Sequence, residues 1–589
     1  MAARQNAKIL SQASALLIQS PYPMKKRTHF KFQKGSHPAA GRLCELPLIF
    51  EFRSVCMHSK VCHSARLFSK RQKGFLLKKL LKFILSRSFI FSVMILAQMG
   101  LFLWLTLQFS RFGPVAYLAL TVGGVLTALA ILERTDTNPS YKIMWMLIIL
   151  LMPVSGILFY FFWGKRIIKP KSARKLLEIE HRAAGAIHPD KSAACAMAHS
   201  HANLRPVCEY LSTHAASPVY TGTKCAYYPT GQAFFESFLE ELKKARRFVF
   251  LEYFIIQEGR MWNETLKILK RKASQGVDVR VIFDGIGSLF TLPSDYEDTL
   301  RRCGIKCYRF NPVHFSLHIS DYKMLNHRNH RKIAVIDGEV GFTGGLNFAD
   351  EYINVRRRFG VWKDTALMLK GPAVYSLTTT FLKAWSFACG EEVQFSQYFP
   401  KTRYPQETHF VQPYDDSPID DENVSESVYS ALIQRAQHYL YITTPYLIID
   451  NEMASSLCLA AKSGVDVRII TPGIPDKWYV YYVTQSYYAR LMRAGVRIYE
   501  YTPGFIHAKM YVSDDEAAIV GSANMDYRSL YLHFENCCIF YGGQMVADVK
   551  RDFLATMRES REVTKEDCRR VPLYKWVAQI FLRFFAPLM

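Results

Sequence analysis

The sequence predicts an α/β protein with two similar halves, each a mixed sheet flanked by helices, behind an N-terminal transmembrane helical module. Two observations predict the halves. Short buried-strand patterns recur in the same order along residues 220–545, and a histidine–lysine motif occurs once in each set. A third observation predicts the module, because three apolar segments near the start contain no charged residue.

The first 87 residues form a basic tail. They contain 18 Lys and Arg but only two acidic residues, Glu45 and Glu51, and so carry most of the formal net charge of +25. Residues 1–70 lack a periodic apolar pattern, which is typical of a disordered segment. Because the charge lies outside the two halves and beside apolar segments, it favours anionic membrane lipids over nucleic acid as partners.

The transmembrane module is expected at residues 88–163, in segments 88–109, 113–132 and 143–163. Each segment is long enough to cross a hydrocarbon layer of ~30 Å at a helical rise of ~1.5 Å per residue. Basic residues flank the module on both sides, which requires an even number of crossings. Whether two or three segments span therefore stays open. Residues 164–215 are expected to be a linker to the body.

The two halves are expected at residues 216–400 and 401–560. Three strand patterns of the first half, 245–256, 276–286 and 303–312, have counterparts at 436–449, 464–474 and 494–504. Helical stretches lie between them, so each half is predicted to be a sheet covered by helices. The 13 cysteines lack metal-ligand spacing and disulfide density, so we expect reduced thiols and no metal.

The C-terminal residues 561–589 form an amphipathic segment. Trp576, Ile580, Phe581 and Phe584 fall near one helical face. Such a helix either lies in a membrane interface or packs against the body, and the sequence leaves both possibilities open.

The same motif, His-x-Lys-x4-Asp-x6-Gly-[Gly/Ser]-x-Asn, closes each half. By chance, one His-x-Lys-x4-Asp should occur roughly 0.05 times in a chain of this length. The duplicated motif is therefore functional rather than accidental. Its residues are His330, Lys332, Asp337, Gly344, Gly345 and Asn347 in the first half, and His507, Lys509, Asp514, Gly521, Ser522 and Asn524 in the second.

This spacing points to chemistry at phosphorus. Residues i and i+2 of a strand face the same way, so each histidine and its lysine share one surface. Lysine supplies charge to phosphate oxygens, and histidine can attack phosphorus or move a proton near neutral pH. The glycines permit close backbone approach, and the asparagine amides can donate to the same oxygens.

The paired motif resembles the signature of the phospholipase D superfamily, over about residues 216–545. The resemblance implies two α/β halves that form one active site without metal or cofactor. One histidine would form a phosphohistidine, and the other would protonate the leaving alcohol and deprotonate the acceptor. By this analogy His330 is the nucleophile and His507 the acid/base, although near-symmetry leaves the reverse open.

The other site residues follow from the same resemblance. Lys332, Lys509, Asn347, Ser522 and Asn524 would hold the phosphoryl oxygens. Asp337 and Asp514 belong to the catalytic motifs but are expected to brace them rather than to touch substrate. Asp364 and Glu535 would orient the histidines. Gly345 replaces the serine present at Ser522, so the halves are not equivalent.

Within the superfamily, the chain is similar to bacterial cardiolipin synthases in residues 133–166, 362–374 and 583–589. Such enzymes transfer a phosphatidyl group between two phosphatidylglycerols and release glycerol, which implies a multi-pass protein of the bacterial plasma membrane. Three alternatives remain: a membrane-bound phospholipase D that forms phosphatidic acid, a superfamily nuclease, and a non-enzymatic membrane scaffold. The donor range, the membrane side of the site and the oligomeric state stay open.

Overall fold

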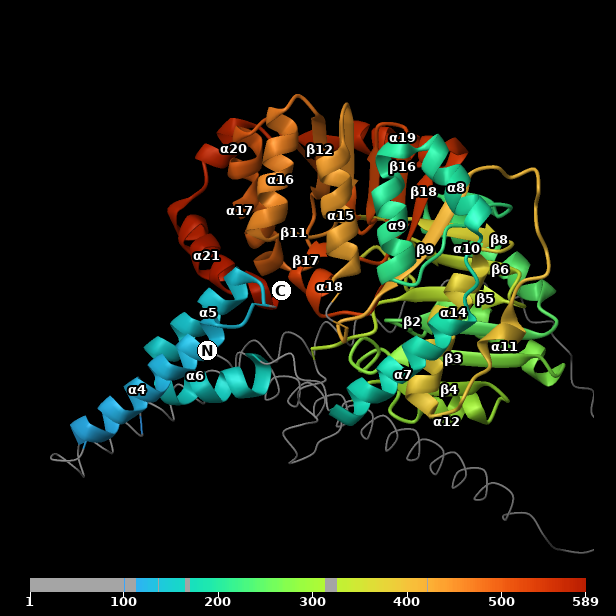
Figure 1. Ribbon diagram of the computed structural model, residues 1–589, viewed down its shortest axis with the longest axis horizontal. Helices are drawn as coiled ribbons and strands as arrows, with labels where there is room; N and C mark the ends of the chain where they lie inside the picture. The colour runs from blue at the N-terminus through green and yellow to red at the C-terminus, as the bar shows by residue number, and fades with distance from the viewer. Residues whose placement is uncertain (1–99, 101–112, 136, 165–169, 313–325, 421) are drawn as a thin grey trace, which may run out of the picture. The chain divides into compact units, whose positions relative to one another are not determined.

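A computed structural model describes residues 100, 113–135, 137–164, 170–312, 326–420 and 422–589 (Figure 1). The predicted segment 88–109 and the basic tail therefore lie outside the described residues, apart from Gly100. The described part contains two mixed sheets with helices against them, which confirms the prediction of two similar α/β halves.

The first sheet has seven strands in the order β1-β8-β6-β5-β2-β3-β4. Strands β2, β3 and β4 are parallel, and the others pair antiparallel. The central strands are buried throughout, because both faces of the sheet are covered. The strands are β1 (Lys224–Tyr228), β2 (Phe248–Tyr253), β3 (Asp278–Asp284), β4 (Lys306–Phe310), β5 (Lys332–Ile336), β6 (Val340–Gly344) and β8 (Ala366–Lys370).

The second sheet repeats this topology. Read from β9, its order is β9-β18-β16-β15-β10-β12-β13-β19, which matches the first sheet strand for strand and adds β19 at the edge. The internal repeat seen in the sequence is thus a repeat of topology. The strands are β9 (Phe410–Asp416), β10 (Tyr439–Thr443), β12 (Asp466–Pro472), β13 (Arg497–Tyr501), β15 (Met510–Ser513), β16 (Ala517–Gly521), β18 (Glu535–Tyr541) and β19 (Ser560–Glu562).

The two sheets face each other across a shared core. This core combines side chains such as Phe250 and Val335 of the first sheet with Met510 and Val520 of the second. Helices α14 (Val374–Cys389) and α19 (Gly543–Arg558) complete it. The sharing means that the two halves form one packed body.

Helices cover the outer face of each sheet. On the first sheet they are α10 (Gly231–Lys244), α11 (Arg260–Ser274) and α12 (Tyr296–Arg301). On the second they are α15 (Val424–Arg435), α16 (Asn451–Lys462) and α17 (Trp478–Arg493). Each of these helices lies in the connection between two strands of its own sheet.

Residues 164–215, expected to be a linker, instead contribute helices to the body. Helix α7 (Pro170–Ala186) buries Leu176 and Ile179 in the shared core, whereas α8 (Lys191–Ser200) and α9 (Arg205–His214) pack on the second half. The linker prediction was wrong because these short helices bury only a few apolar side chains each, which a composition rich in Ala and His conceals.

The N-terminal apolar region contains α4 (Gly113–Leu132), α5 (Pro139–Leu151), α6 (Pro153–Phe159) and the short turn η1 (Tyr160–Gly164). The segment 143–163 was expected to be one continuous span, but its helix breaks at Met152. Met152 precedes Pro153, and a proline disfavours helical dihedrals in the residue before it. Among the described residues, no helix combines the length and apolarity that crossing a membrane requires.

Candidate active site

Two short strand pairs join the halves next to the motif histidines. Strand β14 (Gly504–Ile506) pairs in parallel with β7 (Val361–Lys363), and the N–H of His507 donates to the carbonyl of Lys363 at 2.7 Å. In the other direction Asn329 bridges to Phe534, and the N–H of His330 donates to the Phe534 carbonyl at 2.9 Å. Each histidine is therefore fixed by backbone bonds to the opposite half.

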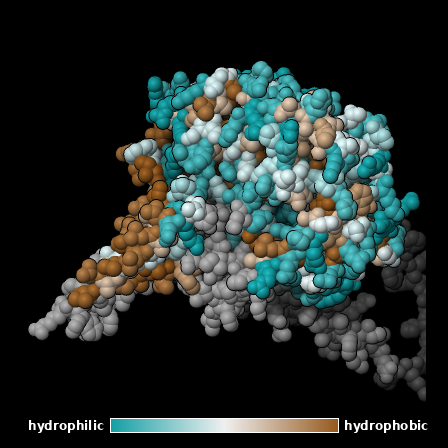
Figure 2. Space-filling model, in the orientation of Figure 1, coloured by the Kyte–Doolittle hydropathy of each residue, from teal (hydrophilic) through white to brown (hydrophobic). Residues whose placement is uncertain are grey.

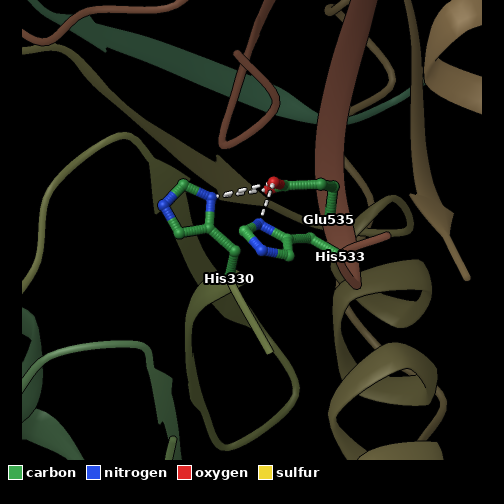
Figure 3. Close-up of side chains that lie close together, drawn as sticks. All are labelled: His330, His533 and Glu535. Atoms are coloured by element: carbon green, nitrogen blue, oxygen red, sulfur yellow. Dashed lines mark hydrogen bonds and ion pairs between the residues drawn. The ribbon is translucent and has the colours of Figure 1, made fainter. Parts of the chain in front are cut away.

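His330 is paired with Glu535 of the second half (Figure 3). Its Nδ1 lies 2.9 Å from Oε1 and 3.0 Å from Oε2 of the carboxylate, and both side chains are buried. Ser522 donates to Oε2 at 2.5 Å and so fixes the carboxylate. Because the carboxylate accepts the Nδ1 proton, Nε2 of a neutral His330 carries the lone pair.

His507 is paired in the same way with Asp364 of the first half. Its Nδ1 lies 2.7 Å from Oδ2, and the other carboxylate oxygen accepts the N–H of Thr365 at 2.8 Å. Lys509 Nζ lies 2.8 Å from the same Nδ1. We assign the Nδ1 proton to the Asp364 contact, because a carboxylate can only accept, and Lys509 also donates to the His507 carbonyl.

The two predicted orienting acids thus act across the boundary between the halves. Asp364 of the first half pairs with His507 of the second, and Glu535 of the second half pairs with His330 of the first. Gly345 makes room for this arrangement, since a Cβ there would lie 2.1 Å from Oδ1 of Asp364. The absence of a side chain at Gly345, where the second half has Ser522, therefore has a steric reason.

Lys332 and Lys509 are buried beside the histidines, and each donates to the carbonyl of the histidine two residues before it. Burial lowers the pKa of Lys509 to about 8 and the pKa of Lys332 well below its usual value. The Asp364 and Glu535 carboxylates oppose both shifts. The positive charge of each lysine is thus held at a desolvation cost that the two carboxylates partly offset.

The histidines are pushed towards their neutral forms. Burial, with the neighbouring Lys509 charge, lowers the pKa of His507 to about 4. Burial and the charge of Lys332 lower the pKa of His330 well below its usual value. An anion placed among these groups would favour their charged forms and raise these pKa values. The arrangement is therefore suited to receive a phosphate group.

The three predicted phosphate ligands make contacts within the protein. Asn347 accepts from the N–H of Ile255 at 3.0 Å and donates to the hydroxyl of Tyr352 at 2.7 Å. Asn524 donates to Asp526 at 2.9 Å, and its Oδ1 is buried without a partner. Ser522 donates to Glu535. Their contact with phosphate oxygens stays a prediction.

Asp337 and Asp514 lie at the opposite ends of β5 and β15 from the histidines. The carboxylate of Asp337 accepts from the N–H groups of residues 246–248, and that of Asp514 from those of residues 437–439. Both residues have φ of 55°. These contacts brace the turns that lead into β2 and β10, and any catalytic part for the two residues stays a prediction.

His533 is a site residue that the motif analysis missed. Its ring centre lies 5.6 Å from that of His330, and its Nδ1 is 3.7 Å from Oε1 of Glu535 (Figure 3). Arg528 donates to its Nε2 at 3.2 Å, and burial lowers the pKa of His533 to about 3. Nδ1 therefore carries the proton and faces the carboxylate.

The equivalent position in the first half is Trp362, two residues before Asp364. Its ring centre lies 5.4 Å from that of His507, and Phe505 packs beside them. The one signal in the sequence was positional, since His533 and Trp362 each precede an orienting acid by two residues.

Within the described residues, His330, His533 and Glu535 are the one group of metal-type ligands whose atoms lie within 4.8 Å of one another. The Glu535 oxygens already accept from His330 and Ser522. We interpret the group as a hydrogen-bonded network around a carboxylate, which leaves few lone pairs for an ion.

A body of two matching α/β halves, with one His–Lys motif from each meeting at a shared site, defines the phospholipase D class. Comparisons with known proteins agree. The family model for "Cardiolipin synthase, PLD-like domain" matches residues 238–385 and 429–557, and a model for the N-terminal part of phospholipase D-nuclease proteins matches residues 124–165.

Two relatives and one solved structure extend this result. The chain is 33% identical over 460 residues to a cardiolipin synthase of Geobacillus kaustophilus, covering 78% of this chain and 91% of that one. It is 43% identical to an uncharacterized protein of Streptococcus mutans, covering 76% and 96%. The phosphatidylserine synthase of Haemophilus influenzae shares the fold, with a TM-score of 0.51 and 13% identity over 65% of this chain and all of that one. The chain belongs to the cardiolipin synthase family of the phospholipase D superfamily.

Proposed function

We propose that the protein is a cardiolipin synthase, which transfers a phosphatidyl group from one phosphatidylglycerol to a second and releases glycerol. The observation that supports this most directly is the exchange of carboxylates, His330 with Glu535 and His507 with Asp364. Both pairs hold the proton on Nδ1, which leaves Nε2 of each histidine available for chemistry.

In the first step, Nε2 of His330 attacks the phosphorus of phosphatidylglycerol. A bond from nitrogen to phosphorus forms, and the bond from phosphorus to the glycerol oxygen breaks. The leaving oxygen takes a proton from Nε2 of His507, which is charged once the phosphate anion has raised its pKa. Lys332 and Lys509 offset the negative charge on the phosphoryl oxygens.

In the second step, the hydroxyl of another phosphatidylglycerol gives its proton to His507 and attacks the phosphohistidine. The phosphorus–nitrogen bond breaks, His330 is restored and cardiolipin is complete. The two steps balance without a metal ion or cofactor. The acceptor must outcompete water, which a buried site with a lipid substrate favours.

We further infer that the protein acts at a membrane, where both substrates reside. The charge-free segments 88–109, 113–132 and 143–163, the match of residues 124–165 to the N-terminal family model and the basic tail support this location. The buried site and apolar neighbours suit a lipid phosphodiester better than a nucleic acid.

Purified full-length protein in vesicles that contain labelled phosphatidylglycerol tests the proposed reaction. We expect labelled cardiolipin and an equal amount of free glycerol. The variant His330→Ala should form neither product, whereas His199→Ala, which changes an exposed histidine on α8, should match the unchanged protein. Phosphatidic acid without cardiolipin would instead identify a hydrolytic phospholipase D.

A further inference from the structure

Helix α21 (Leu573–Phe584) carries its apolar side chains on the outside. Six of them are between 52% and 74% exposed: Leu573, Tyr574, Trp576, Val577, Ile580 and Phe581. At 100° per residue they fall on one side of the helix. A helix that packs on a body in water normally shows the opposite pattern.

The polar side chains of α21 point towards α17. Lys575 Nζ lies 5.2 Å from the ring centre of Tyr482, and Arg583 Cζ lies 4.6 Å from that of Tyr487. Gln579, between them, is buried. The helix is therefore anchored to the second half through its polar side, and its apolar side is left for another partner.

The exposed face of α21 continues into the N-terminal apolar helices. Phe584, Phe585 and Leu588, at and after the helix end, pack against the cluster formed by Trp145 and Ile149 of α5. Helices α4 and α5 also expose apolar side chains along their lengths. Figure 2 shows one hydrophobic band that runs from these helices onto α21. The face is thus part of a larger apolar surface rather than an isolated patch.

A cavity of about 250 Å³ lies where α21, α5 and the second half meet. Its apolar lining includes Ile143, Met144 and Phe584, and its basic lining is Arg490 and Arg583. Arg490 donates to neutral oxygens, Asn451 Oδ1 at 3.0 Å and Ser455 Oγ at 2.8 Å. The cavity therefore places the positive charges of Arg490 and Arg583 beside apolar side chains.

Asp450 also lines this cavity, and its carboxylate is occupied. It accepts from the Tyr531 hydroxyl at 2.6 Å, from Asn138 Nδ2 at 3.1 Å and from the N–H of Met453 at 2.9 Å. Three donors already solvate this acid. The arginines are left as the charged groups able to meet a ligand in the cavity.

We propose that the six exposed side chains of α21 and the adjoining cavity form a surface that docks on anionic phospholipid. The apolar side chains enter the acyl region, and a headgroup phosphate is held between Arg490 and Arg583. An apolar face with basic residues at its edge is the pattern of an interfacial helix. This inference goes beyond the proposed reaction, because lipid contact at α21 needs no turnover.

Photo-crosslinking in the full-length chain tests the surface. A benzophenone side chain replaces Val577 or Phe581, and the protein is placed in vesicles of phosphatidylcholine and phosphatidylglycerol with a labelled tracer. His330→Ala is present throughout, so that no substrate is consumed. The matched control position is Leu459, an apolar residue of α16 that is 67% exposed. We expect labelled lipid on positions 577 and 581 and background label on 459.

Two results would overturn the proposal. One is lipid labelling at 577 and 581 no higher than at 459. The other is crosslinking of these positions to a second copy of the chain or to another segment of the same chain, which gel mobility and peptide mapping separate from lipid adducts.

The cavity has its own test in the same experiment. With tracers of each lipid, the crosslinked adduct at position 577 should be enriched in phosphatidylglycerol, and Arg490→Gln with Arg583→Gln should lower that enrichment by about fivefold or more. Arg493→Gln is the control, because Arg493 is an exposed residue of the same helix as Arg490 and its Nε donates to the backbone carbonyl of Ala489. Enrichment that survives the double change would rule out the arginines as the headgroup site. Because neither readout uses turnover, failure here leaves the proposed reaction to its own test.

Discussion

His330 and His507 carry the same chemistry in different surroundings. A second histidine, His533, lies beside His330 and its partner Glu535, whereas Trp362 lies at the equivalent place beside His507. Ser522 also donates a hydrogen bond to the Glu535 carboxylate, whereas the other half has Gly345 at that position. These differences give each histidine its own electrostatic setting, which one nucleophile and one proton carrier require.

The assignment of His330 as nucleophile can be tested by trapping the covalent intermediate. With labelled phosphatidylglycerol and rapid denaturation, His330→Ala should hold no label, because its attacking nitrogen is absent, and its turnover should fall by about 10³-fold or more. His507→Ala lacks the proton donor for the departing glycerol and should also turn over slowly, but it keeps the attacking nitrogen and should accumulate trappable label over a long incubation. Label that persists in His330→Ala and disappears in His507→Ala would reverse the roles.

The low pKa of Lys509 sets an alkaline limit. Burial lowers this pKa to about 8, so Lys509 is charged below that pH and loses its proton as the pH rises through it. Because His507 must take up a proton from solution, kcat/KM for cardiolipin formation should already fall about tenfold per pH unit above about pH 4, and loss of the Lys509 proton should add a further tenfold per unit above about pH 8. Bound phosphate favours the charged lysine, so the limit in kcat should lie at higher pH.

Lys509→Arg supplies the control for this profile. Arginine stays charged throughout the range, so the additional fall above about pH 8 should disappear even though the altered geometry lowers the overall rate. An additional fall at the same pH in this variant would assign it to another group, such as Lys332, whose pKa is also lowered by burial.

At the level of single residues, the sequence predicted most of the site but not its contacts. The motif spacing identified both histidines and both lysines, and resemblance suggested the two acids. The sequence could not show that the Asn347 amide donates to the Tyr352 hydroxyl, or that His533 lies beside His330. Those contacts arise where chain segments from opposite halves meet, and no local pattern encodes that meeting.

Among the elements, β14 and β7 have the most direct influence on the site. They are three residues long, yet they join the halves immediately before His507 and Asp364. The main sheets were predictable because apolar β-branched runs mark buried strands. These short strands were not, since their pairing depends on how the halves dock. The helical break at Met152 was obscured by the length of the apolar run around it.

Gly504→Ala should separate this strand pair. A Cβ at Gly504 would lie 2.2 Å from the Val361 carbonyl oxygen and 2.4 Å from its nitrogen, so the backbones must move apart. Displacement of His507 by about 1 Å should lower the rate of cardiolipin formation by about 10²-fold, and the thermal midpoint should also fall.

Gly185→Ala is the matched control for this change. Gly185 lies in α7 with no atom within 4 Å of the added carbon, so activity should be kept and stability unchanged or slightly raised. Equal activity of the two variants would show that the strand pair does not position the site.

For the whole molecule, the shared core and the exchanged acids make the two halves one functional unit. Glu535 should act on the first half's histidine and Asp364 on the second half's, across the boundary between them. A synthetic substrate separates these effects: a phosphatidyl ester of nitrophenol, whose leaving group departs without a proton.

With this ester, Glu535→Gln should lose the nitrophenol burst as His330→Ala does, by about 10³-fold. Asp364→Asn should keep the burst and fail in the later transfer to phosphatidylglycerol, as His507→Ala does. Stopped-flow absorbance measures the burst, and product analysis measures the transfer. If Asp364→Asn removed the burst while Glu535→Gln kept it, each acid would serve the histidine of its own half.

The exchange of acids also bears on how such a chain could arise. Each half holds a histidine and a carboxylate that do not meet each other, so one half alone would leave its imidazole without an orienting partner. Two identical halves related by a twofold axis would satisfy both at once, as in any symmetric pair where residue i meets j and j meets i. A single half would thus complete its site only as a homodimer, whereas in one continuous chain the paired positions, Gly345 with Ser522 and Trp362 with His533, are free to differ.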